Sequence, residues 1–301
     1  MRIGISVCSS YPETESRTGA RYMVERARAA RDAGLDSLFV GDHHATLTPY
    51  YQNTAILGRM LAEWGDKPAG ALYLLPLWHP VLLAEQVATL AAIAQGRFIL
   101  QCGLGGDGRQ AAALGSSLST RARDFEQSLD ALRRLWAGEE VTLDGAWSVE
   151  RARISPLPPE PVEVWIGSQA PVAIRRTARL GDGWLASPGL TLDRARDDLN
   201  RFWQACAEYG RDPAAVAIRR DVYVGASSEE ARHKVRPYVE RGYRGFDEKA
   251  LLVGSVDEVA ETLNALSEMG YTDVIVRNLS ADQQESLASI ERLARVRERL
   301  G

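Results

Sequence analysis

One stretch of the chain decides the fold: Gly34-Leu35-Asp36-Ser37-Leu38-Phe39-Val40-Gly41-Asp42-His43-His44. The glycine follows a helical run and is typical of a helix C-terminus. Residues 35–40 are too few for a helix, but they are enough for a short buried strand. An acid and two histidines come directly after this strand, at the position where α/β folds carry their chemistry. We therefore expect an α/β fold with titratable groups at a strand end.

The alternation of strand and helix patterns extends over the whole sequence. We predict eight strands, at 2–8, 35–40, 69–75, 98–102, 162–166, 182–186, 215–224 and 274–276. Helical patterns separate them, the first from Thr18 or Gly19 to Ala33 and the last over 281–300. This order favours a mainly parallel sheet. It predicts a (β/α)8 TIM barrel with insertions, with a doubly wound open sheet as the alternative.

The sequence reads as a single domain over 1–301 with two insertions. Residues 138–161 are irregular and contain four prolines, and strand-like pieces at 141–153 predict a small hairpin within them. Residues 242–254 are punctuated by three glycines and predict a loop insertion.

Composition restricts the possible partners. The net charge is −4, and the 33 arginines that accompany three lysines are spread over many segments, so a nucleic-acid or anionic-membrane partner is not expected. Three cysteines without paired spacing argue against a disulfide framework. Neither a signal-peptide core nor an apolar run of about 18 residues is present. We expect a soluble, reduced, cytoplasmic protein.

The predicted strand ends are poor in acids, bases and metal ligands, except after the second strand. Such a site suggests that a bound cofactor supplies the difficult chemistry. Adjacent residues of an extended chain point in opposite directions, so one of His43 and His44 is expected to face the barrel mouth. Asp42 would orient a histidine or accept a hydrogen bond at the turn; a purely structural loop is the alternative. The spacing of possible ligands predicts no metal site.

Two glycine-containing turns are candidate phosphate sites. Residues 103–108 include four glycines, and Gly167-Ser168-Gln169-Ala170 precedes another predicted helix. Glycine lets backbone N–H groups approach an anion, and a helix N-terminus favours one. Arg109 is close enough in sequence to assist, and Trp78 and Trp184 lie where they would stack on a ring.

Together these segments resemble the luciferase-like monooxygenase family, the flavin- and F420-dependent oxidoreductases built on a barrel. The motifs that carry the resemblance are, in order, Ala33 to His44; Leu75-Pro76-Leu77-Trp78-His79-Pro80 with Ala84-Glu85-Gln86; Gly96-Arg97-Phe98; Gly103-Leu104-Gly105; Val164-Trp165-Ile166-Gly167-Ser168; Gly181-Asp182-Gly183-Trp184; and Leu252-Val253-Gly254-Ser255 with Glu258-Val259-Ala260 and Gly270.

The resemblance implies a ring cofactor across the barrel mouth, with His43 as the active-site histidine and Asp42 beside it. It also implies a bulge under the ring at the end of the third strand. The residues assigned to the cofactor are Ser6, Cys8, His44, Leu74, Leu75, Pro76, Gly103, Leu104, Gly105, Arg109, Gly167, Ser168, Gln169 and Ala170. The residues assigned to the substrate are Tyr50, Tyr51, Trp184 and Arg277.

The sequence departs from the luciferase pattern at two cofactor positions. Leu104 stands where luciferases place an arginine for the FMN phosphate, and Ser168-Gln169 replaces an acid-serine pair. These differences favour F420 slightly over FMN. The predicted function is hydride transfer to, or monooxygenation of, a small organic substrate by a reduced ring cofactor.

Two other functions are considered. A non-catalytic flavin-binding or partner subunit of the same family is disfavoured because the Asp-His-His motif is present. A barrel aldolase, isomerase or metal hydrolase needs a strand-end lysine or a metal cluster, and the three lysines lie elsewhere. The helices at 54–64 and 79–94 fit the family's dimer face, so a homodimer is expected.

Overall fold

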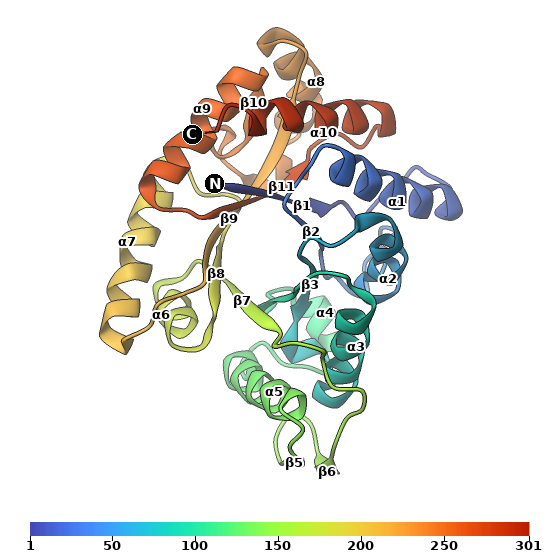
Figure 1. Cartoon of the computed structure of the whole chain (residues 1–301), viewed down its shortest axis with the longest axis vertical. Coiled ribbons are helices and arrows are strands. Elements are labelled where there is room, and N and C mark those ends of the chain that lie inside the picture. The colour runs from blue at the N-terminus through green and yellow to red at the C-terminus, as the bar shows by residue number, and fades with distance from the viewer. Residues whose placement is uncertain (301) are drawn as a thin grey trace.

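The computed structural model describes residues 1–300 of the chain as a closed barrel of strands inside a ring of helices (Figure 1). The strands are β1 (Arg2–Val7), β2 (Ser37–Val40), β3 (Ala69–Leu74), β4 (Phe98–Gly103), β5 (Val141–Leu143), β6 (Val149–Ala152), β7 (Glu163–Ser168), β8 (Gly183–Ala186), β9 (Ala215–Val224), β10 (Leu252–Gly254) and β11 (Asp273–Asn278). The α-helices are α1 (Ser16–Asp32), α2 (Asn53–Trp64), α3 (Pro80–Ile93), α4 (Gly108–Ala113), α5 (Arg121–Trp136), α6 (Pro171–Leu180), α7 (Leu192–Tyr209), α8 (Ser228–Glu240), α9 (Val256–Met269) and α10 (Gln283–Arg297). Three short 3-10 turns complete the set, η1 (Leu75–Leu77), η2 (Tyr243–Gly245) and η3 (Glu248–Ala250).

The main sheet is parallel and closes on itself. Its order is β10-β9-β11-β1-β2-β3-β4-β7-β8, and β8 also pairs with β9. The predicted TIM barrel is therefore confirmed, and the open sheet is excluded because the two ends of the sheet are hydrogen-bonded. β10 was not predicted as a strand. Only three residues long, it falls within the expected 242–254 insertion and pairs with the far end of β9.

Local capping explains where the helices begin. α1 begins at Ser16, two residues before the expected Thr18, because the carboxylate of Glu15 accepts hydrogen bonds from the backbone N–H groups of Arg17 and Thr18.

The expected hairpin within the first insertion is present as the antiparallel pair β5–β6. α10 ends at Arg297, three residues short of the predicted end.

The core has two layers, because side chains of each strand alternate between the barrel interior and the surrounding helices. The interior holds a small cluster: Phe39, Ile99, Trp165, Leu185, Ala215, Ala217 and Ile275. A much larger cluster fills the space between the barrel and the helices. Two residues beyond the interior cluster, the same alternation brings Gly41, Arg219 and Arg277 to the carboxyl end of the barrel, and there the site is built.

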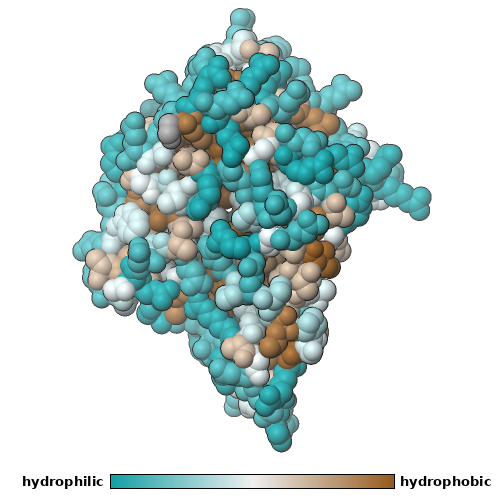
Figure 2. Space-filling model, viewed as in Figure 1, coloured by the Kyte–Doolittle hydropathy of each residue, from teal (hydrophilic) through white to brown (hydrophobic). Residues whose placement is uncertain are grey.

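The surface seen in Figure 2 is mostly hydrophilic, with small apolar patches scattered over it. Within residues 1–300, no helix combines the length and the apolar character needed to cross a membrane.

Close packing at Gly70 gives a test of the barrel interior. A Cβ added there would lie 1.8 Å from the carbonyl oxygen of Ile99, which belongs to the neighbouring strand and cannot move freely. We expect Gly70→Ala to lower the free energy of unfolding by about 3 kcal/mol. Gly58→Ala is the matched control in α2, where the new Cβ meets only Leu90 at 3.8 Å. This control should raise stability by about 0.5–1 kcal/mol. Denaturant unfolding measures both, and equal midpoints for Gly70→Ala and wild type would contradict the packing.

Candidate functional site

A cavity of about 480 Å³ opens at the carboxyl ends of β1, β2 and β11 and beside the middle of β9. Its lining includes the predicted site residues Ser6, Cys8, Asp42, His43, Tyr50 and Arg277. It also includes residues that the sequence analysis did not assign to the site: Val7, Ser9, Ser10, Gly41, Leu72, Arg219, Tyr238, Tyr243, Arg244, Asn278, Leu279, Ser280 and Ala281. The structure thus brings the predicted histidine and a group of arginines to one cavity.

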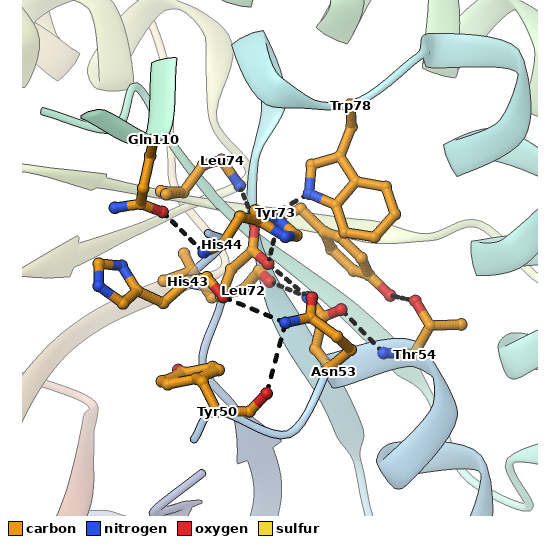
Figure 3. Close-up of polar contacts among 12 residues, drawn as sticks. His43, His44, Tyr50, Asn53, Thr54, Leu72, Tyr73, Leu74, Trp78 and Gln110 are labelled. Atoms are coloured by element: carbon orange, nitrogen blue, oxygen red, sulfur yellow. Dashed lines mark hydrogen bonds and ion pairs between the residues drawn. The ribbon is translucent and has the colours of Figure 1, made fainter. Parts of the chain in front are cut away.

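Asp42 is a buried hub of hydrogen bonds at the end of β2, and its partners Asn53, Leu74 and Trp78 are labelled in Figure 3. One carboxylate oxygen accepts the backbone N–H of Leu74 at 2.8 Å and the indole N–H of Trp78 at 2.9 Å. The other accepts from the Asn53 side chain at 3.2 Å. Buried carboxylates are tolerated only when their oxygens are satisfied in this way. Asp42 therefore ties the end of β2 to the start of α2 and the end of β3.

The two histidine rings project in opposite directions, as the sequence predicted (Figure 3). His44 turns toward Trp78, with ring centroids 5.3 Å apart. Its Nε2 lies 2.9 Å from Asp42 Oδ1, although the ring N–H is not aligned for a hydrogen bond. His43 instead lines the cavity and meets Tyr50 edge to face at 5.6 Å. The backbone on both sides is held, because Gln110 accepts the His44 N–H at 2.8 Å and Gln52 donates to the His43 carbonyl.

The two glycine-containing turns differ in what they offer an anion. At the turn after β4, Asp107 caps α4 and accepts the N–H groups of Arg109 and Gln110, so that helix N-terminus is already occupied. At the turn after β7, no side chain caps α6, and the Ser168 hydroxyl accepts from Thr177 at 2.9 Å. Of the two turns, the one formed by Gly167-Ser168-Gln169-Ala170 presents the free helix N-terminus.

The end of β3 leads into the short turn η1. Leu74, Pro76 and Leu104 border a small gap of about 10 Å³ together with Gly105. Leu75 is buried in the core, and the peptide bonds around Pro76 are trans. The chain thus leaves the strand direction at the place where the resemblance implies a bulge.

Besides His44 and the predicted residues at the ends of β3, β4 and β7, three more predicted site residues lie away from the cavity. Trp184 is fully buried and stacks on Phe202 at 4.9 Å, so it belongs to the core between barrel and helices and does not face a ring at the barrel mouth. The Tyr51 hydroxyl donates to the Ser16 carbonyl at 2.6 Å. Arg109 is exposed on α4. Short apolar strands do not reveal which face is which, and this explains the error for Trp184.

A group of charged residues at the β9 side was missed by the sequence reasoning. Asp221 is fully buried and accepts from Arg219 at 3.0 Å, Arg244 at 3.1 Å and the Tyr243 hydroxyl at 2.9 Å. Burial opposes ionisation of Asp221, but the three nearby arginines outweigh it and lower its pKa. The available signal was the sequence Arg219-Arg220-Asp221 inside an otherwise apolar strand, where buried charges must be paired.

Cys8 and Arg277 form a second polar contact in the cavity wall. Arg277 Nη2 donates to Cys8 Sγ at 3.1 Å, and its Nη1 lies 3.5 Å from the Tyr243 hydroxyl. Burial opposes ionisation of the Cys8 thiol, but the Arg277 guanidinium outweighs it and the pKa of Cys8 is lowered. Burial raises the pKa of Tyr243 to about 12, so its hydroxyl keeps its proton.

No cluster of three or more His, Cys, Asp or Glu side chains that would hold a metal ion occurs within residues 1–300. The site is therefore a barrel mouth with one histidine, several arginines and few carboxylates.

A closed (β/α)8 barrel whose mouth holds one histidine and few carboxylates favours the class of barrel enzymes that use a bound cofactor. The family model described as luciferase-like monooxygenase matches residues 1–250. The chain therefore belongs to the luciferase-like monooxygenase family, and it is an oxidoreductase, as the sequence predicted.

Two relatives agree with this assignment, and a solved structure shares the fold. The chain is 29% identical to an F420-dependent glucose-6-phosphate dehydrogenase of Nakamurella multipartita, over 92% of each chain. It is 26% identical to the enzyme of that name from Intrasporangium calvum, over 89% of this chain and 92% of the relative. The fold is similar to that of monooxygenase RslO1 from Streptomyces bottropensis, with a TM-score of 0.87, 21% identity and 98% of each chain covered.

The Asp42 hub predicts a loss of stability on removal of its charge. In Asp42→Asn one of the two carboxylate oxygens is replaced by an N–H₂ group. This group would face N–H donors that the oxygen accepts in the wild-type protein. We expect the free energy of unfolding to fall by about 2–3 kcal/mol. Asp144→Asn, an exposed position in the β5–β6 turn, is the control and should change stability by less than about 0.5 kcal/mol. Equal denaturation midpoints for Asp42→Asn and wild type would show that the hydrogen bonds of Asp42 do not stabilise the fold.

The Cys8–Arg277 contact predicts a pH-dependent reactivity. Because the pKa of Cys8 is lowered, its thiolate is present below the pH of about 8.5 at which an ordinary thiol titrates. Arg26 also lowers this pKa, whereas the phenols of Tyr11 and Tyr50 are the other titratable groups facing the sulfur. Iodoacetamide modification, followed by mass spectrometry, should therefore reach half its maximal rate at a lower pH than modification of free cysteine in the same buffer.

In Arg277→Gln the pH at which modification reaches half its maximal rate should rise, because the positive charge that most stabilises the Cys8 thiolate is gone. Cys102 serves as the internal reference, because burial raises its pKa and it should remain unmodified. An unchanged midpoint in the variant would show that Arg277 does not stabilise the thiolate.

Proposed function

We propose that this protein is an F420-dependent oxidoreductase that transfers a hydride between the deazaflavin and a small organic substrate, with His43 as its proton donor or acceptor. The observation that carries the proposal is the position of the His43 ring, which lines the cavity while the backbone around it is fixed by Asp42, Gln52 and Gln110. The F420-dependent relatives, which match about nine-tenths of the chain, support the cofactor.

The residues at the barrel rim fit a phosphate-bearing ring cofactor. A Cβ added at Gly103, Gly105 or Gly167 would come no nearer than 3.5 Å to another atom, an ordinary van der Waals contact, so the backbone at these glycines is not tightly covered. Gly167-Ser168-Gln169-Ala170 and the uncapped α6 would hold a phosphate, and Leu74 with Pro76 would lie against the ring. When bound, the deazaflavin accepts or donates a hydride and forms no useful oxygen adduct.

Residues of the chain itself would transfer the proton and exclude water. When an alcohol is oxidised, the hydride leaves carbon and the hydroxyl proton goes to an imidazole nitrogen of His43, which returns a proton in the reverse direction. Tyr50 packs against this ring and limits its movement. Val7, Leu72 and Leu279 provide the apolar part of the cavity wall and exclude water from the reacting atoms.

The expected homodimer and location belong to the same proposal. Leu82 and Ile93 of α3 are 54% and 51% exposed, and such large apolar side chains support an interface on this helix. All three cysteines are free, which supports the predicted reducing, cytoplasmic environment.

Titration with F420 and with FMN tests the proposal. We expect F420 to bind at micromolar concentration, and hydride transfer to proceed without oxygen uptake; glucose 6-phosphate and secondary alcohols are the first substrates to try. His43→Ala should lower kcat by about 10²–10⁴-fold while F420 binding changes little. His233→Ala, an exposed position on α8, is the control. Reduced FMN binding with oxygen uptake would make the protein a monooxygenase, and binding of neither cofactor would refute the proposal.

A further inference from the structure

The wall of the cavity that faces His43 carries more positive charge than its own carboxylates neutralise. Arg219, Arg244 and Arg277 all line the cavity. Asp221 is shared between the first two. Asp42, the other acid of the wall, is held by donors from α2 and the end of β3. Within residues 1–300, Arg277 forms no ion pair with a carboxylate; its hydrogen bonds go to the Cys8 sulfur and the Tyr243 hydroxyl, and Asp221 acts on it only from a greater distance. One guanidinium therefore remains without a carboxylate in direct contact.

The register of the barrel places these charges side by side. Ile275 of β11 pairs with Arg219 of β9, and Arg277 pairs with Asp221. Residues two apart on a strand share a face. Arg219 is two residues after Ala217 on β9, and Arg277 is two residues after Ile275 on β11, so both arginines are on the strand face that carries the interior cluster. The arrangement is thus built by two strands and does not depend on flexible surface side chains.

Two hydrogen-bond donors in this wall have no partner within residues 1–300. The first is Arg219 Nε, and the second is the Asn278 side-chain amide nitrogen. Asn278 is only 7% exposed, and its oxygen accepts from the Ser280 N–H at 3.0 Å and the Ser286 hydroxyl at 3.3 Å. This fixes the orientation of the amide and leaves its N–H₂ group unpaired. A buried donor without a partner is costly, and a bound acceptor removes the cost.

We propose that Arg219, Arg277 and Asn278 bind an oxyanion group of the substrate, a carboxylate or a phosphate, and so hold its reacting carbon toward His43. This inference rests on the proposed function, because it treats the cavity as the substrate site. Guanidinium groups pair with either oxyanion through charge-assisted hydrogen bonds. The site is separate from the uncapped α6 turn, which lies at the end of β7 and is assigned to the cofactor.

Calorimetric titration with inorganic phosphate and with acetate tests the proposal on the whole protein without any turnover. We expect at least one of the two anions to bind to wild type, and the stronger one identifies the class of oxyanion. Arg277→Gln should weaken that binding at least tenfold, and Arg277→Lys should restore part of it. Arg196→Gln, exposed on α7 and outside the cavity, is the matched control and should bind as wild type does.

Asn278→Asp is the sharper variant. It keeps the oxygen that accepts from Ser280 and Ser286 and replaces the unpaired donor by a negatively charged carboxylate in the cavity wall. It should fold, as circular dichroism will show, and abolish anion binding. Unchanged anion binding in both Arg277→Gln and Asn278→Asp, or failure of both anions to bind wild type, would overturn the proposal.

F420 titration of the same variants separates this site from the cofactor site. The proposal expects the dissociation constant of F420 to be unchanged in Arg277→Gln while that of the anion rises. An equal loss of F420 and anion binding would assign the arginines to the cofactor and overturn the substrate role. If wild type binds the anion but neither F420 nor FMN, the anion site stands and the proposed function fails.

Discussion

The Asp42 carboxylate is the contact on which the barrel mouth depends. It stands at the end of β2, only four residues long, and it accepts hydrogen bonds from the backbone of β3, the indole of Trp78 and the side chain of Asn53. A buried charge is stable only while all its donors remain in place, so the carboxylate fixes three elements relative to one another. His43 is the next residue after Asp42, so its backbone is fixed by the same contacts.

The sequence allowed the barrel and this motif to be predicted because both depend on local patterns. Apolar strands alternate with helices over the whole chain, and an acid with two histidines follows one strand. The arginine site could not be found in the same way. Arg219, Arg244 and Arg277 are far apart in sequence, and only the register of β9 against β11 brings two of them together. Similarly, the position of Trp184 depended on which face of a short, fully buried strand points inward, and four residues do not decide that.

The two sides of the barrel mouth differ in the groups that they present. The rim at β4 and β7 offers glycines and an uncapped helix, whereas the wall at β9 and β11 offers guanidinium groups and an amide. The first kind of surface accommodates a large planar group with a phosphate through backbone N–H groups, and the second pairs with a localised negative charge. His43 lines the cavity from the end of β2; under the function proposed above it would exchange a proton with a substrate held at the arginine side, with the ring cofactor on the opposite side.

Stability alone does not explain the charged residues of β9. A buried carboxylate with two arginines is often no better for stability than well-packed apolar side chains of the same volume. The lower part of the same strand is indeed apolar, with Ala215 and Ala217 in the interior cluster, and charge begins only at Arg219. Asp221 then forms ion pairs with Arg219 and Arg244 but leaves Arg277 without a carboxylate in direct contact. A barrel built only to fold would place a further apolar layer here, so the unbalanced charge is the feature that a negatively charged ligand explains.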